Sequence, residues 1–209
     1  MKDVLLEFYV NKFNFLTDSN EINMDFIPQI LRRRLSNIDK CALYMLNQTY
    51  SNDVQNIVFS SQYGEVERLN KLIGQYTKDK EVSPNTFSGS VHNYSEGFFL
   101  LNKKNPVPYT AISAGENSIS MGFLTAILSN YNNILFCYSD YFDNEHSKTF
   151  AVNLAKKNTS QAIKYQIKMK QNTAIEDEFD GYVKLFCGDI KSLNTSTYTI
   201  ERVGDDKNL

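Results

Sequence analysis

The sequence predicts an α/β fold built on a mixed and mostly buried sheet. Over the first two thirds of the chain, short apolar segments alternate with longer segments of helical periodicity. In the last third, a segment of strictly alternating apolar and polar residues is typical of a strand with one buried face. The chain has 209 residues, of which 42% are hydrophobic, so we expect residues 1–209 to form a single domain.

The composition excludes several classes of function. A net charge of −2 argues against a nucleic-acid-binding protein, which needs a basic face. No apolar run approaches the ~20 residues that cross a bilayer, and segment 1–13 lacks the features of a signal peptide, so we expect a cytoplasmic protein without a membrane span. The cysteines Cys41, Cys137 and Cys187 lack metal-ligand spacing and only two histidines are present, so we expect reduced thiols, no metal and no cofactor.

The first elements follow from periodicity and turn residues. A helix is predicted from about Ile27 to Thr49, because spacings of three and four residues gather its apolar side chains on one face. Those side chains are Leu31, Leu35, Ile38, Ala42 and Met45. A short buried strand is predicted at 56–61, and a turn then leads into a helix at 65–78.

The middle of the chain continues this alternation. Ser83 followed by Pro84 is a helix-start signal, and one or two short helices are predicted to end between 102 and 105. A strand at 109–114 then leads through a tight turn into a helix. A further buried strand is predicted at 132–140.

The last third has a different pattern. Segment 162–170 alternates strictly, so we expect a sheet edge or a partner-facing surface there. Segment 148–157 is predicted to pair with it through a polar turn at 157–160. A helix from about Ile175 to Leu193 and a strand at 196–202 complete the chain.

Segment 111–120, AISAGENSIS, predicts a strand end, a tight turn and a helix start. Enzymes often place a nucleophile at such a corner. The corner contains no cysteine and offers four residues: Gly115, Glu116, Asn117 and Ser118. The structural interpretation is that glycine permits the turn while Glu116 or Asn117 caps the helix. It is favoured over a serine nucleophile, because GxSxG is absent and His92 is the only local base.

Two other clusters carry candidate residues. In SVHNYSEG, His92 beside Asn93 could polarise a substrate carbonyl, although a histidine packed in a half-buried turn is the commoner case. Glu96 and Asn93 are also spaced as a helix-capping pair.

Three consecutive arginines, Arg32, Arg33 and Arg34, are candidates for docking an acidic partner. The alternative is a solvated helix face whose aliphatic stems cover the core.

Four segments occur in an order and spacing that resemble a known family: IPQILRRRLSNIDKCAL, IVFSSQYGEVERLNKLI, VSPNTFSGSVHNYSEGFF and YTAISAGENSISMGFLTAI. Together they resemble the N-terminal domain of β-ketoacyl synthase-like proteins, and within it the short chain-length-factor-like type. The resemblance covers residues 25–140, and we expect 141–209 to extend the same domain.

The resemblance implies a thiolase-like fold in which the C-terminal half is truncated. The N-terminal half that is present is expected to be a layered α/β/α unit with a mixed sheet. Condensing enzymes of this fold carry a cysteine at the corner and bring two histidines from the second half. The cysteine position falls on Gly115 or Glu116, with Glu116 preferred, so no thiol is available.

The function implied is that of a non-catalytic chain-length-factor-like subunit of a heterodimeric β-ketoacyl synthase. Such a pair acts in polyene, polyketide or fatty-acid-type biosynthesis. For the short members of this family, the resemblance most often implies aryl polyene biosynthesis. The expected partners are a catalytic ketosynthase and an acyl carrier protein, with the interface near the corner helix and strand 132–140. The candidate tunnel or interface residues are His92, Asn93, Phe98, Phe99, Asn117, Ser118, Phe123 and Phe136. For the four phenylalanines, the sequence does not separate a tunnel role from a core role.

Two alternatives stay open. One is a stand-alone acyl-thioester hydrolase or decarboxylase that uses Glu116, whose pKa would have to be raised by burial. The other is a homodimer that binds an acyl group without reacting.

Overall fold

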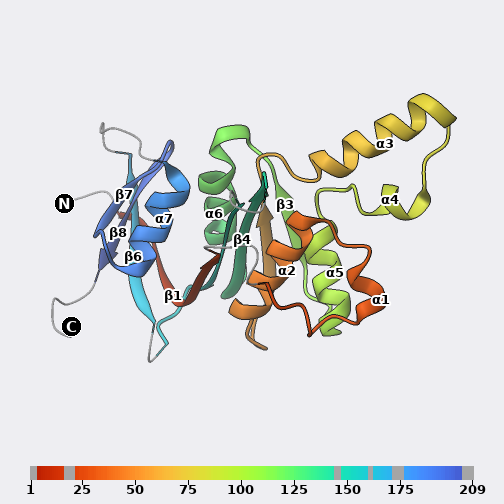
Figure 1. Cartoon of the computed structure of the whole chain (residues 1–209). Coiled ribbons are helices and arrows are strands. Elements are labelled where there is room, and N and C mark those ends of the chain that lie inside the picture. The colour runs from red at the N-terminus through yellow and green to blue at the C-terminus, as the bar shows by residue number, and fades with distance from the viewer. Residues whose placement is uncertain (1–3, 17–21, 144–146, 160–161, 171–176, 204–209) are drawn as a thin grey trace.

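The computed structural model describes residues 4–16, 22–143, 147–159, 162–170 and 177–203. Within these residues a single eight-stranded sheet has the order β3-β2-β4-β5-β1-β6-β8-β7 (Figure 1). The strands are β1 Val4–Leu16, β2 Asn56–Ser60, β3 Tyr109–Ile112, β4 Asn133–Tyr141, β5 Ser147–Ala155, β6 Ile163–Met169, β7 Ser192–Asn194 and β8 Tyr198–Val203. The helices are α1 Gln29–Arg32, α2 Asn37–Thr49, α3 Val66–Asp79, α4 Pro84–Ser88, α5 Tyr94–Lys103, α6 Ser118–Leu128 and α7 Glu178–Cys187.

The mixed sheet predicted from the sequence is confirmed. β2 pairs in parallel with both β3 and β4, whereas every other pair is antiparallel. All residues of β2 are buried, as expected for a strand that is covered on both faces. Helices α2 and α5 pack on one face of the sheet, and α6 and α7 pack on the other. The result is the layered α/β/α arrangement that was expected.

The pairing predicted between segments 148–157 and 162–170 is wrong. β1 lies between β5 and β6 and pairs antiparallel with both. The hairpin was inferred from closeness in sequence, but β1 inserts there because Phe8 and Val10 are buried in the same core as Tyr165. As a consequence β6 pairs with β1 and β8 and is not a sheet edge.

The helix predicted from Ile27 to Thr49 is two helices. α1 ends at Arg32, and α2 begins after Ser36, whose side chain accepts a hydrogen bond from the backbone N–H of Asp39. The Asp39 carboxylate in turn accepts from the backbone N–H of Ser36, which completes a capping box. This capping box begins a new helix at residue 37. The spacing of the apolar residues continues across this point, so it could not indicate the break.

The helix predicted from Ile175 to Leu193 is shorter than expected. Its described part, α7, ends at Cys187, where Gly188 adopts a positive φ of 92°. Leu193 belongs instead to β7. The expected start at Ile175 lies outside the described residues.

Candidate functional site: the corner after β3

The corner lies where the parallel strands β2, β3 and β4 end. Ligand sites of open α/β sheets form at this carboxyl edge, because loops from neighbouring strands meet there. A cavity of about 440 Å³ occupies this position. Its walls come from the loop after β2, the corner itself, the end of β4, β5 and the start of α7.

The backbone of the corner forms a short 3₁₀ turn, Gly115–Asn117, before α6. Gly115 has a φ of +59°, a conformation that other residues rarely adopt. The Ser118 hydroxyl closes the turn, since it accepts from the N–H of Ala114 at 3.0 Å and donates to the carbonyl of Gly115 at 2.7 Å. Ser118 is therefore a buried structural residue and not an exposed nucleophile.

The cap of α6 comes from a distant residue. The predicted caps Glu116 and Asn117 are both exposed, and Asn117 makes no side-chain capping hydrogen bond. Instead the carboxylate of Glu178 accepts from the N–H of Ser120 at 3.1 Å and from that of Ser196 at 3.0 Å. Sequence reasoning missed Glu178 because it lies 58 residues away from the helix that it caps.

One wall of the cavity is organised by Asp140, which is 1% exposed. Its carboxylate accepts from the Ser61 hydroxyl at 2.5 Å, from the backbone N–H groups of Gln62 and Tyr63, and from the Tyr138 hydroxyl. Burial, together with this carboxylate, raises the pKa of Tyr138 well above its ordinary value. The network fixes the loop after β2.

An aromatic pair lines the cavity, with Tyr63 from the loop after β2 and Phe142 from directly after β4. The rings of Tyr63 and Phe142 meet edge-on with centroids 5.4 Å apart, and both side chains are about half exposed. Sequence reasoning missed this pair, and the available signal was the end of strand 132–140, where YSD places polar side chains after a buried run.

An ion pair between β5 and the residue before α7 also lines the cavity. Lys148 Nζ is 2.7 Å from the carboxylate of Asp177, and it also lies 5.8 Å from the ring centroid of Phe179. Burial opposes ionisation of Asp177, but Lys148 and the backbone amides of α7 outweigh it and lower its pKa. The cavity thus combines aromatic walls with paired charges.

The structure separates the other candidate residues. Glu116 and Asn117 line the cavity, but His92 does not. His92 Nε2 bonds to the carbonyl of Ile112 at 3.1 Å, so the ring stabilises the end of β3. Asn93 is exposed before α5 and makes no side-chain cap, so the predicted capping pair with Glu96 is wrong. The reason is that Glu96 is turned into the core, where it is fully buried.

The four candidate phenylalanines do not line the cavity. Phe123 and Phe136 belong to the core under α6 and α7, and their ring centroids are 5.6 Å apart. Phe99 belongs to the core under α2 and α5, and Phe98 is partly buried beside it. In this chain they serve as packing residues.

The three arginines do not share one face. Arg32 donates to the carbonyl of Ile27 at 2.6 Å and pairs with Asp25 at 3.2 Å. Arg33 and Arg34 follow the end of α1 and are exposed. The expected continuous helix face is absent because the chain turns between α1 and α2.

Cys41 and Cys137 are buried and unpaired, and burial raises the pKa of the Cys41 thiol to about 12. The part of the chain that the structure describes contains no group of three or more histidine, cysteine or acidic side chains placed to hold a metal ion. Among the same residues, no helix combines the length and the apolar character that crossing a bilayer requires.

Comparison with known families gives a match over residues 10–184 to the family described as the N-terminal domain of β-ketoacyl synthase. A comparison with curated proteins gives no match.

Solved structures show the same fold. A ketosynthase (ApeO) in complex with its chain length factor (ApeC) from Xenorhabdus doucetiae contains a chain with a TM-score of 0.70 and 18% identity, over 94% of this chain and 100% of that one. The ishigamide ketosynthase/chain length factor has a TM-score of 0.53 and 8% identity, over 81% of this chain and 68% of that one. A β-ketoacyl synthase from Burkholderia phymatum STM815 has a TM-score of 0.55 and 9% identity, over 83% of this chain and 66% of that one. The architecture is therefore that of the thiolase-like ketosynthases.

Proposed function

The chain belongs to the β-ketoacyl synthase N-terminal-domain family, and on this premise we propose that it is a non-catalytic, chain-length-factor-like subunit of a heterodimeric β-ketoacyl synthase. The observation that carries the proposal is the corner after β3, which borders a cavity but offers no thiol among residues 111–120. Acyl transfer through a thioester needs a cysteine nucleophile, so a partner must supply it.

We assign the nucleophile position to Gly115 in preference to Glu116. A nucleophile at a strand-to-helix turn sits in a strained backbone conformation, and Gly115 is the corner residue with positive φ. A Cβ atom at this position would meet nothing within 4 Å, so the space for a side chain is open. On this assignment the corner keeps the backbone shape of an active site without its reactive group.

The N-terminus of α6 supports the same conclusion. The partial positive charge of a helix N-terminus can stabilise an anion during catalysis. Here Glu178 already places a carboxylate on the N–H of Ser120. An internal anion therefore competes with any anionic intermediate for this end of the helix.

The open edge of the sheet offers a way to join the partner. β3 is the terminal strand, and β2 bonds to the carbonyls of Pro108 and Ile112. Since alternate residues face the neighbour in a parallel pair, Tyr109 and Ala111 direct their backbone groups away from β2. A strand of the partner can pair there. The strand expected near the interface, β4, is separated from this edge by β2.

In the proposed pair, the ketosynthase extends a chain carried on acyl carrier protein, and this subunit closes the far end of the acyl tunnel. Tyr63, Ile119 and Phe142 line the corner cavity and replace the core phenylalanines as candidates for setting product length. We place the pair in the cytoplasm and in polyene, polyketide or fatty-acid-type biosynthesis.

The stand-alone hydrolase or decarboxylase has no support in the geometry. It requires a buried Glu116, whereas this side chain is exposed at the cavity. The remaining alternative, an acyl-binding homodimer, is an outcome of the test that follows.

The test uses this chain together with the full-length, cysteine-bearing ketosynthase of the same genome. We expect a one-to-one complex that elongates acyl chains, no thioester turnover by this chain alone, and weaker association in Ala111→Pro, which removes an outward N–H. Ser192→Pro, in the edge strand β7 at the other end of the sheet, is the matched control. A homodimer of this chain that does not bind the ketosynthase would overturn the proposal. Thioester turnover by this chain alone that Glu116→Gln abolishes would also overturn it.

A further inference from the structure

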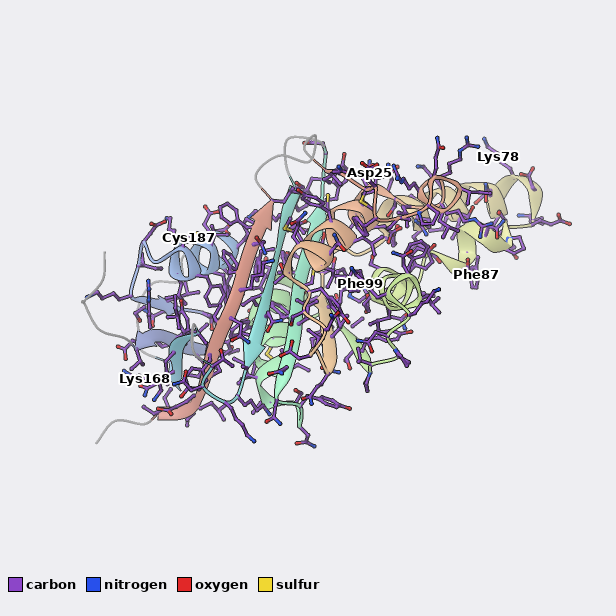
Figure 2. All side chains as sticks on the ribbon, turned by 90° about the horizontal axis from the view of Figure 1, so that it is seen from below. Asp25, Lys78, Phe87, Phe99, Lys168 and Cys187 are labelled. Carbon is purple, nitrogen blue, oxygen red and sulfur yellow. The ribbon has the colours of Figure 1, made fainter. Side chains whose placement is uncertain are left out.

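Helices α3 and α4 and the loop between them form an arm, residues 66–88, that stands away from the sheet. In Figure 1 the arm extends beyond the end of the sheet at which β3 lies. Figure 2 shows Lys78 and Phe87 on the arm, well separated from the core residue Phe99. In α3 only Arg68 and Leu72 are buried, and α4 has no buried residue. The arm therefore leaves most of its own apolar side chains uncovered.

Four of these side chains form a stripe along α3: Val66, Leu69, Ile73 and Tyr76. Spacings of three, four and three residues place them on one side of the helix. Their exposed fractions lie between 45% and 57%, and Val82 and Phe87 elsewhere on the arm are exposed as well. Six such side chains present roughly 500 Å² of apolar surface, more than half of the ~800 Å² that each partner of a standard interface contributes.

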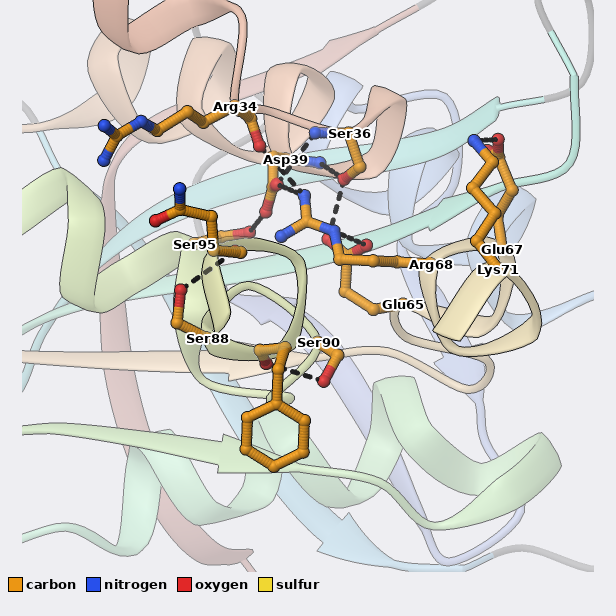
Figure 3. Close-up of polar contacts among 12 residues, drawn as sticks. Arg34, Ser36, Asp39, Glu65, Glu67, Arg68, Lys71, Ser88, Ser90 and Ser95 are labelled. Atoms are coloured by element: carbon orange, nitrogen blue, oxygen red, sulfur yellow. Dashed lines mark hydrogen bonds and ion pairs between the residues drawn. The ribbon is translucent and has the colours of Figure 1, made fainter. Parts of the chain in front are cut away.

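A buried polar cluster fixes the direction of the arm at its base (Figure 3). Arg68, in the first turns of α3, lies 2.7 Å from the carboxylate of Asp39 in α2 and 3.2 Å from that of Glu65. Ser36 donates to Glu65 at 2.7 Å, and Ser95 of α5 donates to Asp39 at 2.7 Å. These contacts join the arm to both helices of one face.

The Arg68 side chain is enclosed on its remaining sides. Its guanidinium carbon is 5.2 Å from the ring centroid of Tyr94. A Cβ atom on Gly89 would lie 1.4 Å from Nη1 of Arg68, so the chain between α4 and α5 packs directly on the guanidinium. The stripe is thus presented in a set orientation, which lowers the entropy that binding would cost.

We propose that the stripe on α3 is a docking surface for the catalytic ketosynthase subunit. The inference rests on the proposed function. The arm leaves the body at the same end as the open strand β3, so a partner that pairs with β3 lies beside the arm. The ion pair between Glu67 and Lys71, at 2.6 Å, lies on the other side of α3, because Lys71 is two residues from both Leu69 and Ile73. The four positions of the stripe itself are all apolar. The surface therefore suits an apolar groove or helix of a folded subunit and not a strongly acidic partner such as acyl carrier protein.

The test introduces charge into the stripe. Leu69→Glu combined with Ile73→Glu adds two carboxylates at exposed positions, so the fold of the isolated chain should persist. Gln75→Glu is the matched control, because Gln75 is exposed on the same helix but lies two residues from Ile73, on the opposite side. We expect the double variant to weaken binding of the same-genome ketosynthase at least tenfold with an unchanged Tm, and the control to bind as the wild type does.

A photo-crosslinking residue at position 73 gives an independent readout, with position 75 as its control. Crosslinks to the ketosynthase from position 73 alone support the inference. A wild-type complex that the double variant forms equally well overturns the inference and leaves the proposed function intact. A wild-type chain that binds no ketosynthase overturns both. Crosslinks between two copies of this chain assign the stripe to self-association and also overturn the inference.

Discussion

Two buried carboxyl groups of this protein have opposite surroundings. Asp140 accepts four hydrogen bonds, whereas neither oxygen of Glu96 has a hydrogen-bond partner among the described residues. Burial, with the Asp39 carboxylate nearby, raises the pKa of Glu96 to about 8. Glu65 responds in the same way, since burial and the Asp39 carboxylate raise its pKa to about 8. Asp140 therefore organises a loop, while Glu96 is a destabilising residue of the core.

This difference predicts how stability depends on pH. Below about pH 4.5 Glu96 is protonated in the folded and the unfolded chain. Between about pH 4.5 and 8 it ionises only in the unfolded chain, so the free energy of unfolding falls as the pH rises. Above pH 8 the penalty no longer changes.

We expect Glu96→Met to raise the free energy of unfolding at pH 8 by roughly 1–3 kcal/mol, because it removes an unsatisfied polar group from the core. Urea unfolding between pH 4.5 and 8.5 measures the effect. The variant should show a shallower pH dependence than the wild type, with a residual slope from Glu65. An unchanged slope would show that the pKa of Glu96 is the same in the folded and the unfolded chain, which contradicts the effect of burial.

At the scale of elements, helices α3 and α6 each contain a glycine, for different reasons. In α6, a Cβ atom on Gly122 would lie 2.6 Å from Cβ of Ser60 and 2.9 Å from the ring of Phe136. This glycine lets α6 pack closely on β2 and β4. In α3, a Cβ atom on Gly74 would meet nothing within 4 Å. Close packing therefore requires one glycine, and no contact requires the other.

The two alanine substitutions should change stability in opposite directions. Gly122→Ala is expected to cost about 1–3 kcal/mol through overpacking. Gly74→Ala is expected to add about 0.5–1 kcal/mol, because alanine loses less backbone entropy in a helix. Denaturant unfolding of both variants under one set of conditions gives the comparison. Destabilisation by Gly74→Ala would contradict the helical arm.

At the scale of the whole molecule, β1 joins the two parts of the sheet. On one side lie β3, β2, β4 and β5, and on the other lie β6, β8 and β7. Phe8 of β1 stacks on Tyr165 of β6 with ring centroids 5.5 Å apart and meets Phe123 of α6 edge-on at 5.4 Å. The N-terminal strand is thus central to the core.

We expect Phe8→Ala to lower the free energy of unfolding by about 3–5 kcal/mol, as for other fully buried aromatic side chains. Glu7→Ala is the neighbouring control, because Glu7 is exposed and pairs with Lys164 at 2.8 Å on the surface. Its cost should stay below about 1 kcal/mol. Thermal unfolding of the two variants is the measurement, and similar costs would contradict the central position of β1.

Local sequence patterns predicted much of this fold. A turn located α3, the helix-start signal at Ser83 and Pro84 located the helices that end with α5, and apolar residues on one face located α6. Short apolar segments between turn residues located β2, β3 and β4. The segments that resemble β-ketoacyl synthases pointed to the family and to the corner at residues 111–120. These features depend on neighbours along the chain, so the sequence alone determined them.

Only the tertiary structure decided the order of the strands and the partners of the buried polar groups. The expected hairpin of β5 and β6 does not form, because β1 lies between these strands and pairs with both. The cap of α6 comes from Glu178. The sequence left the four phenylalanines open as tunnel or core residues, and the structure places them in or against the core, while Tyr63 and Phe142 line the cavity. The physical reason is that these contacts join residues far apart in sequence. Their stability depends on which surfaces the whole fold buries together, and a local period carries no information about that choice.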